Sequence, residues 1–264
     1  MLGTGKGYVI HSTAIIDQSA RLAGDVSVGP YSIIGADVEI GSNSSIGSHV
    51  VINGPTRIGK ENRIFQFSSI GEIPQDKKYA GEKSGLEIGD RNIIREFVTL
   101  NRGTADGIGK TIIGSDNLFM AYSHVAHDCI IGNHTVFANA ASLAGHVTIG
   151  DYTILGGFTL VHQFTQIGSK AFCGFGSLVA QDIPPFSTVA GIRARTIGIN
   201  KEGLKRQGFS PDLIRALHQS FRALLKSSTP KKDVYEKLQP LCDQYPEVEE
   251  FVSFVRNSKR GIAR

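Results

Sequence analysis

The sequence predicts a mainly β protein. A parallel β-helix in the shape of a triangular prism is expected over residues 1–185, followed by a C-terminal α-helical domain over residues 186–264. Three observations lead to this fold class. An apolar residue recurs at every sixth position, two polar glycine-rich segments interrupt that repeat, and a pair of prolines ends it before helical apolar spacing begins.

The six-residue repeat predicts the β-helix. Twenty-six hexads carry an apolar residue in step, and glycine commonly follows it. The series runs from Ile10 to Ile70, resumes over residues 88–100, and runs again from Ile113 to Val179. An apolar residue followed by a small one suits a short strand and a tight turn. Three hexads close a coil of eighteen residues, and successive coils stack as parallel strands about 4.8 Å apart.

Two segments are too polar and too rich in glycine to form coils. They read GEIPQDKKYAGEKSGL, residues 71–86, and RGTADGIGK, residues 102–110. Both are expected to project as loops, and loops on a rigid scaffold are where functional residues tend to lie. The alternative is that both are tolerated insertions.

The repeat ends at QDIPPF, where two prolines mark a boundary. Ser210 and Pro211 then predict the N-cap and first turn of a helix. Its apolar face comprises Leu213, Ile214, Leu217, Phe221, Leu224 and Leu225. A second helix is expected to begin near Pro246, with Val248, Phe251, Val252 and Val255 on one face. Such helices would cover the open end of the β-helix.

Composition restricts the class of protein. No run of about 18 apolar residues is present and the first ten residues lack the features of a secretory signal, so we expect a cytoplasmic protein without stable membrane insertion. Cys129, Cys173 and Cys242 are scattered along the chain, which indicates neither a disulfide framework nor a thiolate zinc site. We interpret them as buried or half-buried residues.

Charge is distributed unevenly along the chain. The formal net charge is +4, but residues 185–264 contain fifteen Lys or Arg and eight Asp or Glu, a surplus of +7 that leaves −3 for the rest. This basic end is expected to attract an acidic partner. Nucleic acid is disfavoured, because no aromatic-studded basic strand pattern or zinc-finger spacing accompanies the charge.

The stretch HVAHDC, residues 124–129, is predicted to lie in a histidine-rich patch. Val125 is in the apolar register and should point inward, so the flanking histidines should point outward. The coil length of eighteen residues places Gly145 next to His127, and His146 over Asp128. The predicted patch comprises His124, His127, Asp128, Gly145, His146, His162 and Gln163.

Three interpretations of the patch are open, and acid–base catalysis is favoured. One class of zinc proteins with this repeat uses two histidines five residues apart, and no pair here has that spacing, so no metal is expected. Solvated surface histidines are the second possibility. An imidazole titrates near neutrality and can contribute about 10²–10⁴-fold to a rate as a general base. A glycine amide one coil away can approach a developing oxyanion closely.

Several motifs resemble one family of hexapeptide-repeat acyltransferases. QDKKYAGE, HVAHDC, LAGHV, VHQF, AQDIPP and NKEGLKRQGFS, together with the hexads and the helical tail, are similar to the UDP-N-acetylglucosamine acyltransferases over essentially the whole chain. The resemblance implies a left-handed parallel β-helix and a homotrimer with active sites between subunits. It implies transfer of a 3-hydroxyacyl chain from acyl carrier protein to the 3-hydroxyl of UDP-N-acetylglucosamine, the first step of lipid A synthesis. It implies no cofactor other than the phosphopantetheine of the carrier protein.

The resemblance also implies residue roles. His127 would be the general base, Asp128 would orient it, and the Gly145 amide would form the oxyanion hole. Further residues match those that bind the sugar and its phosphate, line the pocket, or contact the uridine and phosphate: Asp76 and Lys78; His124, His146, His162 and Gln163; and Asn200, Glu202 and Arg206. Gln207 stands where some members carry a second arginine, which puts that cation in doubt.

One set of stacked residues departs from the pattern of family members that transfer long acyl chains. Asn139, Gly157 and Phe175 follow one another at eighteen-residue steps, and long-chain members can carry glycine at the position of Phe175. A phenyl ring at the far end of an acyl groove is expected to shorten it and to favour shorter chains. The alternative is a ring that packs between coils.

Two other functions remain open. An enzyme of the same fold that acylates the amine of a 3-amino UDP-sugar would need almost the same residues. The related N-acyltransferase of the pathway has an additional N-terminal uridine-binding domain, which is not expected here because the hexads begin by Ile10. The other possibility is a β-helix that binds carrier protein or nucleotide sugar without turnover.

Overall fold

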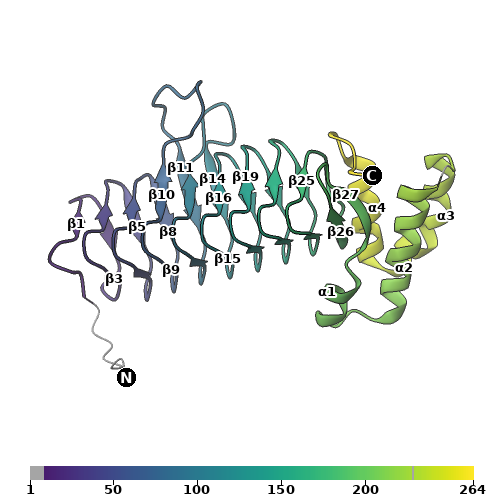
Figure 1. Ribbon diagram of the computed structural model, residues 1–264, viewed down its shortest axis with the longest axis horizontal. Coiled ribbons are helices and arrows are strands. Elements are labelled where there is room, and N and C mark those ends of the chain that lie inside the picture. The colour runs from purple at the N-terminus through teal and green to yellow at the C-terminus, as the bar shows by residue number, and fades with distance from the viewer. Residues whose placement is uncertain (1–8, 228) are drawn as a thin grey trace.

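The computed structural model describes residues 9–227 and 229–264. Short parallel strands wind into a prism with three faces, the loops project from its side, and the helices gather at one end (Figure 1). The first face contains β1 (Ile15–Ile16), β4 (Ile33–Ile34), β7 (Val51–Ile52), β10 (Ser69–Glu72), β13 (Thr99–Asn101), β16 (His124–Val125), β19 (Ser142–Leu143), β22 (Leu160–Val161) and β25 (Leu178–Val179).

The other two faces follow the same order along the prism. The second face contains β2 (Arg21–Leu22), β5 (Val38–Ile40), β8 (Thr56–Ile58), β11 (Gly85–Ile88), β14 (Lys110–Ile113), β17 (Ile130–Ile131), β20 (Thr148–Ile149) and β23 (Gln166–Ile167). The third face contains β3 (Ser27–Val28), β6 (Ser45–Ile46), β9 (Arg63–Ile64), β12 (Ile93–Ile94), β15 (Leu118–Phe119), β18 (Val136–Phe137), β21 (Ile154–Leu155), β24 (Phe172–Cys173), β26 (Ser187–Ala190) and β27 (Arg195–Ile199).

The chain turns three times in each coil. The first corner joins the first face to the second, the second corner joins the second face to the third, and the third corner leads back to the first face. Residues eighteen apart pair across neighbouring coils, as His124 does with Ser142 and Val136 with Ile154. The predicted coil length is therefore confirmed.

The apolar residue of each hexad points into the prism. Val125 and Phe137 are fully buried, and Ile131 retains 2% of its surface. Burying one such side chain contributes about 1.5–3 kcal/mol relative to leaving it exposed. In the first described coil Ile10 is 51% exposed, because no earlier described coil covers it.

The three cysteines are free and buried, as the sequence predicts. Burial raises the pKa of the Cys129 and Cys173 thiols to about 12, and that of the Cys242 thiol to about 11. At neutral pH all three therefore remain thiols, which are poor nucleophiles.

Both predicted loops project from the first corner (Figure 1). Their bounds are slightly shorter than expected, because β10 and β11 extend into the first segment, and β14 begins at Lys110. The first loop is thus residues 73–84 and the second loop is residues 102–109. They leave the prism in consecutive coils directly before the coil that carries His127.

The C-terminal region is not entirely helical, which corrects the expectation for residues 186–264. Residues 187–190 form β26, which pairs with β24, and residues 195–199 form β27, which runs antiparallel to β26. The last coil would otherwise present unpaired backbone groups, and this hairpin satisfies them. The C-terminal segment contributes as well, since the Ala263 N–H donates to the Asp182 carbonyl at 3.0 Å.

Helices then cover the hairpin. They are α1 (Lys201–Arg206), α2 (Pro211–Phe221), the π-helical turn η1 (Arg222–Lys226), α3 (Lys231–Gln244) and α4 (Pro246–Asn257). The predicted start of α2 is confirmed, because Ser210 Oγ accepts a hydrogen bond from Leu213 N–H at 3.2 Å. The helices share one apolar cluster with Phe186 and Ile199 of the hairpin. None of the helices in the described part of the chain is long and apolar enough to cross a membrane.

Candidate active site

A hydrogen-bonded histidine–aspartate pair lies at the first corner. His127 Nδ1 is 2.9 Å from Asp128 Oδ2. The Asp128 side chain is completely buried, whereas that of His127 retains 13% of its surface. Burial alone would raise the pKa of Asp128, but hydrogen bonds from Thr104 and His127 outweigh it and lower that pKa below its ordinary value. Asp128 is therefore an anion at neutral pH.

Gly145 packs directly against the imidazole of His127. A Cβ atom at Gly145 would lie 2.5 Å from His127 Cε1 and 2.7 Å from Nε2, closer than side chains approach one another. Within the described residues the Gly145 N–H has no hydrogen-bond acceptor, although its carbonyl accepts from Phe164 N–H at 3.1 Å. The predicted proximity of His127 and Gly145 is confirmed.

His146 completes the group around Asp128. Its Nε2 lies 4.0 Å from Asp128 Oδ2, and its ring meets that of His127 edge-on with centroids 5.0 Å apart. Burial is the main reason that the pKa of His146 is lowered, although the charges of Asp128 and Asp76 act in the opposite direction. His146 has a φ of +61°, and its ring stacks on that of Phe164 with centroids 4.4 Å apart.

His124 lies on the first face beside this group. Its Nδ1 is 2.7 Å from Thr99 Oγ1, and it is half-buried. Burial lowers the pKa of His124, and the nearby His127 lowers it further. His124 is therefore neutral at neutral pH, as is His146.

His127, Asp128 and His146 are close enough to be considered as metal ligands. One donor atom from each lies within 4.8 Å of the others. The carboxylate, however, already accepts hydrogen bonds from His127 and from the second loop, so the arrangement is accounted for without an ion. The eighteen-residue spacing predicts that His146 joins His127 and Asp128, because stacking of coils brings it over Asp128. The absence of a metal remains a prediction.

His162 and Gln163 lie at the first corner, further along the prism. His162 Nδ1 is 2.7 Å from a guanidinium nitrogen of Arg260 and 3.2 Å from the Gln163 carbonyl. Arg260 also donates to the Ala180 carbonyl at 2.8 Å. The sequence offers no signal for this cation, since ninety-eight positions separate it from His162.

The first loop brings Asp76 toward the histidines. The Asp76 carboxylate is close enough to affect the pKa of His146, and it caps its own turn by accepting from Lys78 N–H at 3.0 Å. The Lys78 side chain is exposed. Arg102 contacts the Gly54 carbonyl and lies 3.5 Å from Tyr79 Oη, so it supports the base of this loop.

The residues matched to the nucleotide contacts lie elsewhere on the same chain. Asn200 caps α1 by accepting from Gly203 N–H at 3.1 Å, and it donates to the Lys170 carbonyl at the second corner at 3.1 Å. Glu202 pairs with Lys205 at 2.9 Å. The side chains of Arg206 and Gln207 are exposed at the end of α1.

The predicted acyl column lies at the third corner. A Cβ atom at Gly157 would be 3.3 Å from the Phe175 ring and 3.4 Å from the Asn139 carbonyl, so the three residues are stacked as expected. Phe175 is 76% exposed and meets Phe158 edge-on at 5.6 Å. Within one chain, the histidines therefore lie at the first corner, Asn200 contacts the second corner, and the predicted acyl column lies at the third.

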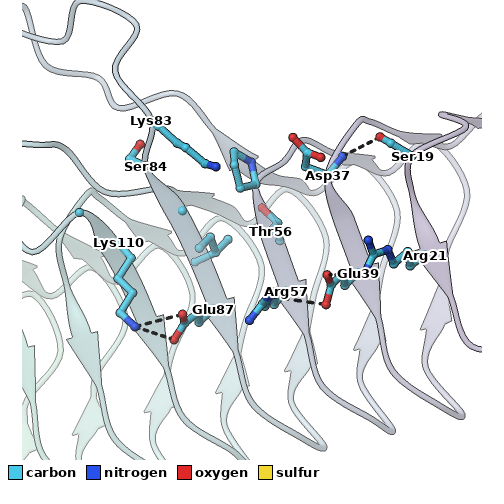
Figure 2. Close-up of a pocket in the computed structure, with 14 residues that line it drawn as sticks. Ser19, Arg21, Asp37, Glu39, Thr56, Arg57, Lys83, Ser84, Glu87 and Lys110 are labelled. Atoms are coloured by element: carbon cyan, nitrogen blue, oxygen red, sulfur yellow. Dashed lines mark hydrogen bonds and ion pairs between the residues drawn. The ribbon is translucent and has the colours of Figure 1, made fainter.

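A separate cavity lies on the second face, and Lys83, Ser84 and Gly109 at the ends of the two loops form part of its lining (Figure 2). It measures about 440 Å³, and an alternating ladder of charges crosses its floor. Arg21 and Arg57 lie 3.7 Å and 3.5 Å from Glu39, and Lys110 lies 3.0 Å from Glu87. None of the predicted site residues lines this cavity. The ladder offsets its own charges and indicates no particular ligand.

Two family models that match this chain identify the class of protein. A family described as bacterial transferase hexapeptide repeats matches residues 110–145, and one described as UDP N-acetylglucosamine O-acyltransferase, domain 2, matches residues 182–263. The fold is that of the hexapeptide-repeat acyltransferases, a left-handed parallel β-helix followed by a helical part.

Full-length relatives identify the family within that class. Proteins named acyl-(acyl-carrier-protein)–UDP-N-acetylglucosamine O-acyltransferase from Halorhodospira halophila and Neisseria gonorrhoeae are 53% and 54% identical, covering 97% of this chain and 99% of their own. The crystal structure of UDP-N-acetylglucosamine O-acyltransferase from Moraxella catarrhalis superimposes with a TM-score of 0.94 at 44% identity, covering 97% and 99% of the two chains. The enzyme from Francisella novicida superimposes with a TM-score of 0.93 at 41% identity over 97% and 94%. This chain belongs to the UDP-N-acetylglucosamine O-acyltransferase family.

Proposed function

We propose that this protein transfers a 3-hydroxyacyl chain from acyl carrier protein to the 3-hydroxyl of UDP-N-acetylglucosamine, the first step of lipid A synthesis. The observation that carries the proposal is the packing of His127, paired with Asp128, directly against Gly145, whose N–H has no acceptor within the described residues. The names of the relatives support the two substrates.

His127 is the proposed general base. An ionised carboxylate can only accept hydrogen bonds, so the Asp128 anion requires the His127 proton to be on Nδ1. The lone pair of Nε2 is then free to remove the proton of the sugar 3-hydroxyl as its oxygen attacks the thioester carbonyl. The imidazolium formed in that step is stabilised by the Asp128 charge.

Gly145 is the proposed oxyanion donor. Attack on the thioester moves negative charge onto the carbonyl oxygen, and a free backbone N–H directed at that oxygen stabilises the transition state. The absence of a side chain lets the reacting atoms lie close to both this amide and His127. Collapse of the intermediate expels the phosphopantetheine thiolate and leaves an ester on the sugar.

The reaction as proposed needs no cofactor besides the carrier's phosphopantetheine. A thioester is already activated, so a base, an oxyanion donor and good positioning suffice. The buried cysteines of this chain are unsuited to a covalent intermediate, because their thiols do not ionise near neutral pH. We therefore propose that the acyl chain passes directly from the carrier protein to the sugar.

A homotrimer with sites between subunits accounts for the separation of the predicted site residues. His127, Asn200 and Phe175 are associated with different corners of one prism, and one rigid chain cannot bring its own corners together. Parallel packing of three prisms would bring unlike corners of neighbours face to face. The proposed sugar contacts of Asp76 and Lys78 and the uridine contacts of Asn200, Glu202 and Arg206 then complete one site from more than one chain.

The basic C-terminal region is the proposed docking surface for acyl carrier protein. A cavity of about 510 Å³ between α1 and α2 is lined by Lys201, Arg215, His218 and Arg222, and by no acidic residue. Burial lowers the pKa of His218, and the charges of Lys201 and Arg222 lower it further, which is the sign of a locally positive potential. Acyl carrier protein is acidic, so this potential speeds its association in the cytoplasm, where we place the reaction.

The proposed reaction is tested by product mass. The purified protein is incubated with UDP-N-acetylglucosamine and a panel of 3-hydroxyacyl carrier proteins, and a product heavier by one 3-hydroxyacyl group is expected. Mild base should remove that group, because an ester hydrolyses where an amide does not. A base-stable product, formed faster from a 3-amino UDP-sugar, would instead establish the N-acyltransferase. Absence of product with every donor would indicate a binding protein without turnover.

The Phe175→Gly substitution is expected to move chain-length preference toward longer acyl chains. The phenyl ring is 76% exposed at the end of the Asn139–Gly157 column, so its removal would lengthen the groove. The measurement is kcat/KM for donors that differ by two methylenes, each methylene being worth up to about 0.8 kcal/mol of burial. An unchanged ratio between the long and short donors would mean that the ring packs aside from the chain.

A further inference from the structure

The second loop closes over the carboxylate that holds His127. Asp128 Oδ2 accepts from Thr104 Oγ1 at 2.7 Å and from His127 Nδ1 at 2.9 Å. The Thr104 N–H lies 3.1 Å from Oδ2 and 3.2 Å from Oδ1, and the Ile108 N–H donates to Oδ1 at 3.1 Å. Except for His127, every one of these donors belongs to the loop.

The contact is built into the backbone of the loop. Thr104 is 3% exposed and Asp128 is 4% exposed, so water does not substitute for the missing donor if one is removed. A Cβ atom at Gly107 would lie 2.3 Å from Asp128 Cγ, and glycine therefore allows the loop to close. The Thr104 carbonyl accepts from the N–H groups of Gly107 and Gly109 at 3.3 Å and 3.1 Å, which holds the turn together.

Thr104 and His127 share a single oxygen of Asp128. A carboxylate can turn about its Cβ–Cγ bond, and each turn changes which oxygen faces the imidazole. Donors on both oxygens prevent that rotation, and the Thr104 hydroxyl does so on the oxygen that faces His127. It also stabilises the anion, since the Thr104 hydrogen bond lowers the pKa of Asp128.

We propose that Thr104 is a positioning residue: acting through Asp128, it keeps the proton of His127 on Nδ1 and leaves Nε2 free as the base. The inference rests on the proposed role of His127 and adds a residue to it. It also assigns a purpose to the second loop beyond that of a tolerated insertion, because the loop supplies the donors that orient the catalytic pair.

The test compares three variants of the full-length protein. Thr104→Val keeps the shape and the backbone N–H but removes the hydroxyl, and Thr104→Ser keeps a hydroxyl. Thr153→Val is the matched control, because Thr153 is also fully buried and its hydroxyl donates to the Gly168 carbonyl at 3.0 Å at the second corner. Each variant is assayed for kcat and for KM with UDP-N-acetylglucosamine and a 3-hydroxyacyl carrier protein. The tautomer of His127 is read separately by long-range nitrogen–proton NMR without substrates.

In Thr104→Val we expect the fraction of His127 that carries its proton on Nδ1 to fall. We expect kcat to fall by about tenfold to 100-fold, which is part of what a general base supplies, and KM to change little. Thr104→Ser should restore both, and Thr153→Val should alter neither even if it lowers the melting temperature. An unchanged tautomer in Thr104→Val overturns the inference, whatever the rate. A changed tautomer with an unchanged kcat supports the positioning by Thr104 and instead counts against His127 as the base.

Discussion

His127→Ala is expected to lower kcat for acyl transfer by about 10²–10⁴-fold, the contribution that a positioned general base makes. The ring pairs with the buried Asp128 anion and is itself only 13% exposed, so few other groups can reach the hydroxyl proton in its place. KM for UDP-N-acetylglucosamine should change little, because proton removal belongs to the transition state and not to ground-state binding. The measurement is the initial rate of ester formation at saturating donor.

The matched control is His134→Ala. His134 lies in the same coil but at the second corner, where it stacks on Tyr152 with ring centroids 4.6 Å apart. Within the described residues it contacts neither His127 nor Asp128. Its substitution should leave kcat within about twofold of that of the unmodified protein, the range of a surface substitution that touches no special feature. Equal activity of His127→Ala and the unmodified protein would refute the assignment of the base.

Gly145→Ala keeps the backbone N–H but is expected to lower kcat by about 10²–10³-fold, as much as losing one oxyanion donor would, because the added methyl group crowds the space between the amide and the imidazole. The added methyl group would lie 2.5 Å from His127 Cε1, so the imidazole must move away from the amide. The single added methyl group therefore disturbs both the proposed base, His127, and the proposed oxyanion donor, the Gly145 amide. The fold should persist, because the methyl group meets the end of a side chain and no backbone. Rates and thermal unfolding are measured on the same preparation.

Gly24→Ala controls for the substitution itself. Gly24 lies at the second corner near the N-terminal end, and a Cβ atom there meets nothing within 4 Å. This variant should keep both its rate and its melting temperature. If Gly145→Ala retained most of its activity while the control did likewise, the close approach of Gly145 to His127 would not be required for acyl transfer.

Local sequence signals were sufficient for most of the scaffold. Each hexad places one apolar residue inward, and the eighteen-residue coil correctly predicts that Gly145 lies beside His127. The start of α2 could be predicted from Ser210 and Pro211, since a cap is determined by neighbouring residues. The hairpin of β26 and β27 could not, because its strands form only when the edge of the last coil is there to pair with them.

The candidate site also contains residues whose positions the sequence predicts and residues whose positions it does not. His127, Asp128 and His146 could be placed together by counting residues along regular coils. Thr104 could not, because the second loop breaks the count and its path depends on where its backbone finds acceptors. Arg260 reaches His162 from the C-terminal segment for a comparable reason: the contact requires the end of the chain to return along the prism.

The amino-acid sequence by itself determined a prism of eighteen-residue coils and the family to which the chain is similar, because a periodic structure converts distance along the chain into position in space. Only the tertiary structure decided how the Asp128 carboxylate is held and which predicted residues share a corner. These features depend on an irregular loop and on the closing segments, whose positions are set by long-range hydrogen bonds and packing that no local pattern encodes.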